Sequence, residues 1–293
     1  MFDSFIFLGN TTRCATHLLS MLVVILSAEL SATSMSADAQ ENAAALLTSR
    51  HNAARKHCMQ LHEGTHSTAR TTTALSHGGW CLGAPIADHP AHLRHSGGVV
   101  ELPHNQTFAL PQGHYVADGG VVAVLAKILQ TGQSVNDFGA GVGEYGHALK
   151  AINESIAWRG YDGAGNIEEY TNGFVRFFDL TVNLSLPRAD WVLSLEVGEH
   201  IPRHFEQRYM RNLNAHNCRG IIGSWARPGQ SGIGHVNTRN RTDVLGSFME
   251  MGYRADERLL AEFVGAKHPW TYPLIRQNLF VVVRENPTCR ADF

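Results

Sequence analysis

An acid followed by three glycines is the first group of residues whose types and spacing suit chemistry. Asp137 stands at the end of a short apolar run, and the turn after it contains Gly139, Gly141 and Gly143. Glycine lets the backbone turn tightly and approach a ligand, because a Cβ would block either the required φ or the close contact. A nucleotide-like cofactor is therefore the expected ligand of this turn.

A second group of polar residues lies further along the chain. Glu196, Glu199 and His200 lie at and just after the end of an expected strand, and His235 belongs to the polar loop after the next one. Carboxylates and imidazoles that converge at a strand end are poorly compensated alone, whereas a hard divalent cation with its waters would satisfy them. His200 is also a candidate general base. The plainer alternatives are a backbone hydrogen bond from His200, and two glutamates that only shape an acceptor pocket.

The glycine turn fits two different cofactors. Residues 141–146 satisfy the G-x-G-x-x-G fingerprint of dinucleotide-binding proteins. From Asp137 to Gly143 the order is acid, apolar, Gly, small, Gly, apolar, Gly, which resembles motif I of the class I S-adenosylmethionine (SAM) methyltransferases. The resemblance implies that Asp137, Gly139, Gly141 and Gly143 surround the methionine end of SAM.

The stretch Glu196-Val-Gly-Glu-His-Ile-Pro202 strengthens this resemblance. It is similar to the E-V-x-E-H-[IV]-P signature after strand four in ubiquinone-type O-methyltransferases and small-RNA 2′-O-methyltransferases. A dehydrogenase would have no reason to carry it, so an NAD-dependent oxidoreductase becomes a minor alternative. The resemblance implies a Mg²⁺ or Mn²⁺ ion on Glu196, Glu199 and His200. The loop after the fifth strand is expected to reach the same cleft edge, so His235 is the candidate fourth ligand. Glu199, His200 and His235 are the candidate catalytic residues.

Two further acids end the expected second and third strands. Asp162 lies about twenty residues beyond the glycines, where a carboxylate can accept both ribose hydroxyls of an adenosine. Its alternative role is to start a turn. Methyltransferases of this class often hold the adenine after the third strand. The resemblance therefore implies that Asp179 and the backbone of Leu180 face the adenine, with loop capping by Asp179 as the alternative.

Strands and helices alternate through residues 112–293, which predicts an α/β fold with a doubly wound, mostly parallel sheet. The resemblance, which covers residues 112–286, implies seven strands with the last one antiparallel. Helices are expected at residues 119–130, 203–213, 242–251 and 257–264, with a short one at 166–172. Strands are expected at the run before Gly139 and at residues 156–162, 175–180, 190–197, 220–225, 253–256 and 278–284.

The N-terminus has the pattern of a secretory signal. The apolar run Leu18–Leu30 is too short for a comfortable membrane span, and Ala37–Ala39 offers a small-residue cleavage site before Gln40. Residues 1–39 are thus expected to be a signal peptide or an uncleaved signal-anchor, with passage through the secretory pathway. The alternatives are a buried helix or a mitochondrial presequence in a cytoplasmic or organellar protein.

Residues 40–111 are expected to form a poorly structured extension, helical at most over residues 40–60. Its one expected anchor point is Gly78–Leu82. After cleavage in an oxidising compartment four cysteines would remain, namely Cys58, Cys81, Cys218 and Cys289. They permit two disulfides, but three different pairings are possible.

Charge limits the partners that the protein can have. The chain of 293 residues has a net charge near −2, which gives no general attraction to nucleic acid or an anionic membrane surface. A small-molecule acceptor is therefore expected, approached by Gln230 and Asn237 on the loop, while Trp225 and Trp270 are either an apolar wall or core residues. The alternative functions are a catalytically inactive SAM-fold binding protein and an NAD-dependent oxidoreductase.

Overall fold

A computed structural model describes residues 37–63, 79, 81–82, 98–102, 106–110 and 117–289, with gaps at 184, 233, 270 and 288. The chain divides into two compact units, Met1–Glu41 and Asn42–Phe293. Of the first unit, the described residues are the start of helix α2 (Ala37–Glu63). The expected signal segment Leu18–Leu30 lies outside the described residues. None of the described helices is long and apolar enough to cross a membrane.

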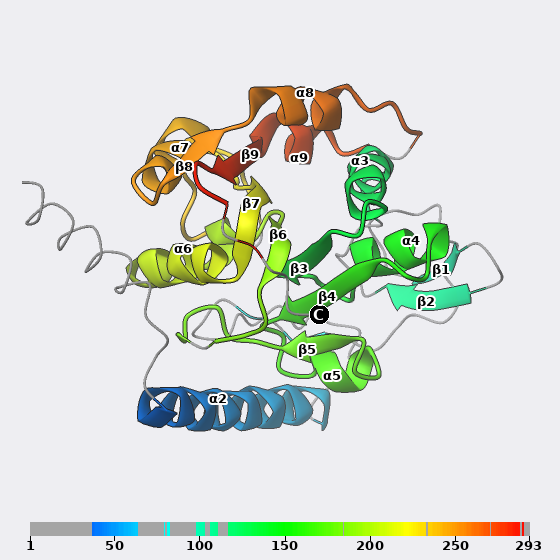
Figure 1. The fold of residues 1–293 in the computed structure, drawn as a ribbon. Coiled ribbons are helices and arrows are strands. Elements are labelled where there is room, and N and C mark those ends of the chain that lie inside the picture. Colours follow the sequence, from blue (N-terminus) through cyan, green and yellow to red (C-terminus); the bar gives the residue numbers. More distant parts are fainter. Residues whose placement is uncertain are drawn as a thin grey trace, which may run out of the picture. The chain divides into compact units, whose positions relative to one another are not determined.

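A seven-stranded mixed sheet is the centre of the second unit (Figure 1). Its order is β5-β4-β3-β6-β7-β9-β8, and β9 runs antiparallel to both of its neighbours. The strands are β3 (Ser134–Phe138), β4 (Ala157–Asp162), β5 (Val175–Phe177), β6 (Ala189–Ser194), β7 (Asn217–Ser224), β8 (Tyr253–Ala255) and β9 (Leu279–Arg284). This confirms the predicted doubly wound α/β fold and its antiparallel last strand.

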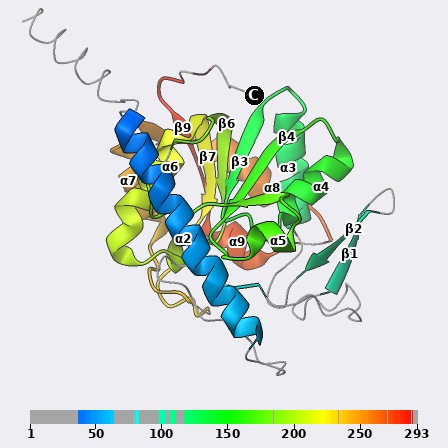
Figure 2. The same ribbon diagram turned by 90° about the horizontal axis from the view of Figure 1, so that it is seen from below.

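Both faces of the sheet are buried. Neighbouring strand residues alternate between two apolar clusters, as Leu193 and Val192 do on β6, and this matches the period of two of a strand. One cluster includes α3 (Gly119–Leu129), α4 (Glu144–Ile152) and α8 (Glu257–Gly265), and the other includes α6 (Glu206–Ala215) and α7 (Arg241–Met249). Figure 2 shows the strands between α6 and α7 on one side and α3 and α4 on the other.

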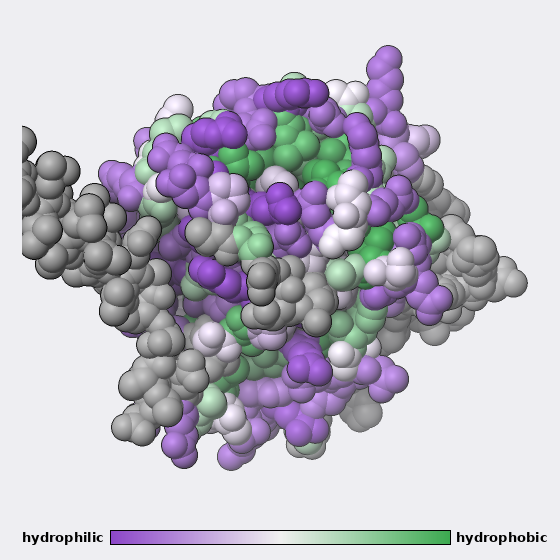
Figure 3. Space-filling model, viewed as in Figure 1, coloured by the Kyte–Doolittle hydropathy of each residue, from purple (hydrophilic) through white to green (hydrophobic). Residues whose placement is uncertain are grey.

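Short helical segments complete the carboxyl side of the sheet. These are α5 (Ile167–Tyr170), α9 (Pro273–Asn278) and two 3-10 turns, η2 (Gly198–His200) and η3 (Arg203–Phe205). Of these, α9 and η2 were not predicted. The surface in Figure 3 is largely polar, and its apolar areas include the region of α8 and α9, where Val264 and Leu274 are exposed.

The strands β5 and β6 each end three residues earlier than predicted. After β5, the carboxylate of Asp179 accepts the amide of Thr181 at 2.8 Å, which turns the chain. After β6, Glu196 takes a left-handed φ of 54°, which extended backbone does not allow. Both acids therefore stand in turns and not in strands, so their side chains lie at the carboxyl edge of the sheet.

The N-terminal extension contains more regular structure than predicted. The helix α2 runs from Ala37 to Glu63, and β1 (Gly98–Leu102) pairs antiparallel with β2 (Gln106–Leu110). The buried residues of α2 are mostly small, namely Ala43, Ala54 and Cys58. Small residues give a weak hydrophobic pattern, yet the helix extends only three residues beyond each end of the predicted range 40–60.

The predicted anchor of the extension is confirmed. Cys81 and Leu82 are buried, and Leu82 exchanges two hydrogen bonds of 2.9 Å with the side chain of Asn166. Cys81 also forms a disulfide with Cys58, and Cys218 forms a second one with Cys289. This pairing answers the question that the sequence left open.

Candidate active site

The glycine turn lies at the carboxyl end of β3 and has the strained backbone that glycine permits. Gly139, Gly141 and Gly143 have φ values of 77°, 55° and 89°. A Cβ on Gly139 would lie 2.3 Å from Cγ2 of Val197, and the Gly139 amide donates to the Tyr161 carbonyl at 2.8 Å. The turn is thus fixed between the ends of β4 and β6, where a ligand can approach its backbone.

Asp137 is buried directly under this turn. It accepts a hydrogen bond of 3.1 Å from the indole N–H of Trp158. Burial raises the pKa of Asp137 to about 8, and the nearby charges of Glu144 and Asp162 raise it further while Trp158 opposes the shift. No lysine or arginine in the described part of the chain forms an ion pair with Asp137. A carboxylate in this position favours a ligand that brings positive charge.

Asp162 joins the end of β4 to the glycine turn. Its carboxylate accepts the Gly141 amide at 3.0 Å and the Ala164 amide at 2.8 Å. The side chain is half-buried, and each of its oxygens thus holds one backbone amide of the turns on either side. The structure therefore brings Asp137, the glycines and Asp162 together, in the arrangement expected for one cofactor.

Asp179 is buried, and both of its oxygens already have partners in the protein. Its Oδ1 accepts from the amide and hydroxyl of Thr181, and its Oδ2 accepts from Arg50 at 2.6 Å. The side chain is fully buried by these contacts. Asp179 therefore caps the turn, as its alternative role predicted.

The second group of predicted residues also meets in space. Single ligand atoms of Glu199, His200 and His235 all lie within 4.8 Å of one another. Nε2 of His235 lies 4.0 Å from Oε1 of Glu199, and the two imidazole rings are 5.1 Å apart. Each ring is oriented through Nδ1, which faces the Gly234 carbonyl in His200 and the Gln230 carbonyl in His235.

Glu199 has an unusual environment for a carboxylate. It is fully buried, and neither of its oxygens has a hydrogen-bond partner among the described residues. Burial raises the pKa of Glu199 to about 8, and the charge of Glu196 adds to the shift. The amides of Glu199 and Ala226 lower the pKa without making hydrogen bonds of normal geometry. Burial likewise lowers the pKa of His200 to about 4, with the charge of His235 as the second cause.

Glu196, the fourth predicted metal ligand, lies outside this set of three. Its oxygens accept from Gln230 at 3.2 Å and Asn278 at 3.4 Å, and Asn278 also donates to Gln230 at 2.8 Å. The left-handed backbone at Glu196 gives the side chain this direction. Asn278 was missed by the sequence analysis, because a single Asn between a helix and a strand carries no motif.

The loop after β7 is built around Glu199. The Glu199 carbonyl accepts the amides of Val236 at 2.8 Å and Asn237 at 3.0 Å, which places His235 beside the carboxylate. Asn237 is buried and donates to Glu206, so it holds the loop and does not face an acceptor. Trp225 donates to the Asn237 carbonyl and packs in the core, as its plainer alternative predicted, whereas Trp270 lies outside the described residues.

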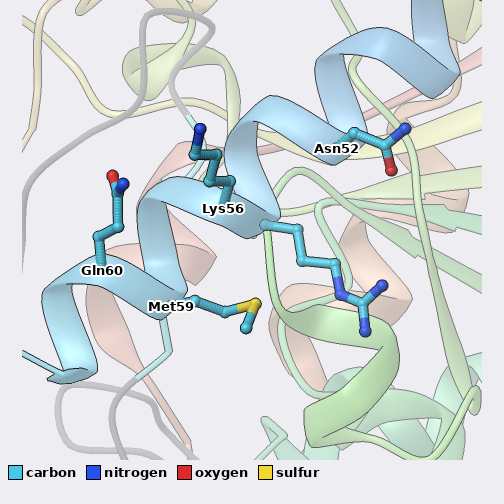
Figure 4. Close-up of a pocket in the computed structure, with 5 residues that line it drawn as sticks. Asn52, Lys56, Met59 and Gln60 are labelled. Carbon is cyan, nitrogen blue, oxygen red and sulfur yellow. The ribbon is translucent and has the colours of Figure 1, made fainter.

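A separate surface hollow lies along α2 (Figure 4). Its lining side chains come from one helix and include none of the acids or histidines described above: Asn52, Arg55, Lys56, Met59 and Gln60. Arg55 is already paired with Glu169. This hollow therefore does not compete with the glycine turn as the site of chemistry.

No protein-family model and no curated protein matches the sequence. Many solved structures have a similar fold. A magnesium protoporphyrin IX methyltransferase from Synechocystis with bound SAH has 18% identity and a TM-score of 0.42, over 57% of this chain and 83% of that one. CalS10, an amino pentose methyltransferase from Micromonospora echinaspora, has 13% identity and a TM-score of 0.40, over 56% and 89%. The methyltransferase domain of bacterial CtHen1-C has 14% identity and a TM-score of 0.38, over 55% and 94%.

Proposed function

We propose that this protein transfers the methyl group of SAM to a small-molecule acceptor. The buried Asp137, next to Glu144 and Asp162 at the glycine turn, is the observation that supports this proposal most strongly. SAM brings an ammonium group and a sulfonium to such an acidic site, whereas the pyrophosphate of NAD would add two negative charges. The same fingerprint therefore favours SAM over a dinucleotide once its surrounding charges are considered.

The chain's own residues supply binding and orientation. Asp137 accepts the ammonium of SAM, the glycine backbone lies along the methionine part, and Asp162 accepts the ribose hydroxyls. The acceptor approaches from the side of Glu199, His200 and His235. Methyl transfer is an in-line displacement that forms a bond from the acceptor atom to the methyl carbon and breaks the bond to sulfur, so positioning is the main contribution. An imidazole of this group that does not hold a cation could take the acceptor proton.

A divalent cation fits the second cluster. Glu199 has two buried oxygens without partners among the described residues, and two imidazole rings lie beside it. A buried carboxylate without a partner is costly, and one carboxylate with two imidazoles is a familiar donor set for Mn²⁺ or Zn²⁺, less so for Mg²⁺. A bound ion would lower the pKa of an acceptor hydroxyl. Glu196, Gln230 and Asn278 would then form the polar rim of the acceptor site.

An active enzyme and an inactive SAM-binding protein differ in turnover. We expect incubation with methyl-labelled SAM and fractionated small-molecule extract to yield S-adenosylhomocysteine together with a labelled product. The small net charge favours a neutral or small acceptor over a nucleic acid, because phosphate-binding surfaces need clustered positive charge. SAM bound without product formation in every fraction would favour the inactive binding protein.

SAM affinity should depend on pH through Asp137. The free protein has an Asp137 pKa of about 8, and the bound ammonium favours the ionised carboxylate. Affinity should therefore fall as pH decreases below 8, by up to about tenfold per pH unit, and should fall again above 8 as the ammonium of SAM loses its own proton. Calorimetry at pH 7 in buffers of different ionisation enthalpy should show release of about one proton. A constant affinity from pH 6 to 8 would contradict this role of Asp137.

We further propose that the protein passes through the secretory pathway. The two disulfides, Cys58–Cys81 and Cys218–Cys289, are typical of oxidising compartments. Together with the apolar run Leu18–Leu30 they support cleavage before Gln40. Amino-terminal sequencing of protein made in eukaryotic cells should give Gln40 as the first residue, whereas an intact Met1 on a cytosolic product would refute the proposal.

A further inference from the structure

Arg50 of α2 is bonded to the turn that follows β5. Its Nη1 donates to Oδ2 of Asp179 at 2.6 Å and to Oγ1 of Thr181 at 2.9 Å. Both partners are fully buried, while the Arg50 side chain is 30% exposed. Loss of one partner from a buried ion pair leaves the other charge uncompensated. The geometry of the turn thus depends on the position of α2.

The same helix packs against the turn after β4. The backbone of Ala54 lies so close to Gly165 that a Cβ there would be 2.5 Å from the Ala54 carbonyl carbon, with Sγ of Cys58 at 2.9 Å. The ring of His51 stacks on Phe177 at the end of β5, with centroids 4.3 Å apart and planes 4° apart. The helix therefore contacts the ends of two neighbouring strands.

A covalent bond holds this helix in place. Cys58 of α2 is bonded to Cys81, and the next residue, Leu82, forms two hydrogen bonds with Asn166. Asn166 belongs to the turn that begins at Asp162. The extension is therefore fastened to the turn that carries the candidate ribose acid, and not to a remote part of the sheet.

The proposed cofactor would extend towards this helix, an argument that rests on the proposed function. With methionine at the end of β3 and ribose at the end of β4, the base continues in the same direction. Neighbouring strands are about 4.8 Å apart, so the base reaches the turn after β5. That turn contains Asp179 and Leu180. Nε2 of His51 is buried there without a partner among the described residues, and an adenine edge carries donors and acceptors that suit such an atom.

We propose that α2 lines the adenine end of the cofactor site. Arg50 positions the turn at Asp179, and the Cys58–Cys81 disulfide holds α2, and with it Arg50, in place. Arg50 acts through Asp179 and Leu180, so it is a positioning residue. Loss of Arg50 should weaken the binding of SAM by disordering the turn. The group Glu199, His200 and His235, on the other side of the glycine turn, should stay intact.

The first test removes the covalent bond. Cys58→Ser with Cys81→Ser should raise the SAM Kd about tenfold, the loss expected when the competent arrangement falls to about a tenth of the population. Cys218→Ser with Cys289→Ser is the matched control, because this disulfide joins the start of β7 to the C-terminal segment. It should leave the SAM Kd within about twofold of the wild-type value.

The second test changes the ion pair. Arg50→Met alone leaves a buried charge, so it is combined with Asp179→Asn, which keeps the hydrogen bonds from Thr181. The double variant should also bind SAM about tenfold more weakly than the wild type. Arg50→Lys alone keeps a positive charge beside Asp179, so it should retain most of the wild-type affinity. Circular dichroism reports whether the fold persists. Binding of Mn²⁺ in the absence of SAM reports whether the group Glu199, His200 and His235 persists.

The outcomes separate this inference from the proposed function. Unchanged SAM affinity in the Cys58→Ser, Cys81→Ser variant and in the Arg50→Met, Asp179→Asn variant would overturn the role of α2 while leaving the methyltransferase proposal in place. Failure of the wild-type protein to bind SAM would overturn both. Equal losses in both disulfide variants would assign the effect to general stability and would also overturn the role of α2.

Discussion

Asp137→Asn should bind SAM about 100-fold more weakly than the wild-type protein, the loss of about 3 kcal/mol expected for a buried charge-assisted contact. The substitution removes the negative charge that would face the ammonium of SAM. It keeps an oxygen that can accept the indole N–H of Trp158, so the local packing is preserved. The effect should therefore appear in binding and not in folding.

The Asp137→Asn substitution should not lower the stability of the free protein, although it weakens SAM binding. The pKa of Asp137 rises from 3.8 to about 8 on folding. Its stabilising contribution is complete below 3.8 and is lost as pH increases to about 8, because ionisation is costlier in the folded state. The uncharged variant lacks this penalty, so at pH 8 its melting temperature should equal or exceed that of the wild type.

Calorimetric titration with SAM and thermal melting at pH 8 check both expectations. Asp190→Asn is a suitable control, because Asp190 is a buried carboxylate at the amino end of β6, paired with Arg219. The Asp190→Asn variant should have a lower melting temperature than the wild type but bind SAM with unchanged affinity. Wild-type SAM affinity in Asp137→Asn would remove Asp137 from the cofactor site.

Substitution of Glu199 or His235 should strongly weaken metal binding, which is the second large effect. The three ligand atoms of Glu199, His200 and His235 form the candidate centre. Glu199→Gln and His235→Ala should each weaken Mn²⁺ binding by about 100-fold or more. Each removes a direct ligand, and the loss of a residue that only contacts a ligand already costs about 10- to 100-fold. In the wild type, Mn²⁺ at 100 times its Kd should stabilise the fold by about 2.7 kcal/mol.

Glu196→Gln is the matched control for these variants. Glu196 is not among the three ligand atoms but its charge acts on Glu199, so its substitution should weaken Mn²⁺ binding by about tenfold, less than the loss of a direct ligand. Isothermal titration with Mn²⁺ and melting with and without chelator measure the effects. If chelator leaves methyl transfer complete and Mn²⁺ does not shift the melting temperature, the cluster is an acceptor site without a metal.

Local patterns predicted the core of the fold and the grouping of the candidate site. The glycines and acids from Asp137 to Asp162 fall at strand ends, and parallel strands bring their carboxyl ends to one edge. The same rule brought Glu199 and His235 together across 35 residues of intervening sequence. Here short-range pattern and sheet topology were sufficient.

Features that depend on side-chain direction or distant partners could not be predicted in this way. Glu196 shares the motif of Glu199, but its left-handed backbone directs it to Gln230 and Asn278. Asp179 looked like a ligand at a strand end, and only the position of Arg50, 129 residues away, shows why it is buried. The small buried face of α2 gave no hydrophobic pattern strong enough to predict this contact.

Titration of the oxidised protein with SAM and with NAD at pH 8, with the heat of binding as the signal, tests the central claim most directly. The acidic glycine turn predicts that one SAM binds per chain, that S-adenosylhomocysteine competes with it, and that NAD gives no heat of binding. Binding of NAD without binding of SAM, or binding of neither by a correctly folded protein, would contradict the assignment of this site to SAM.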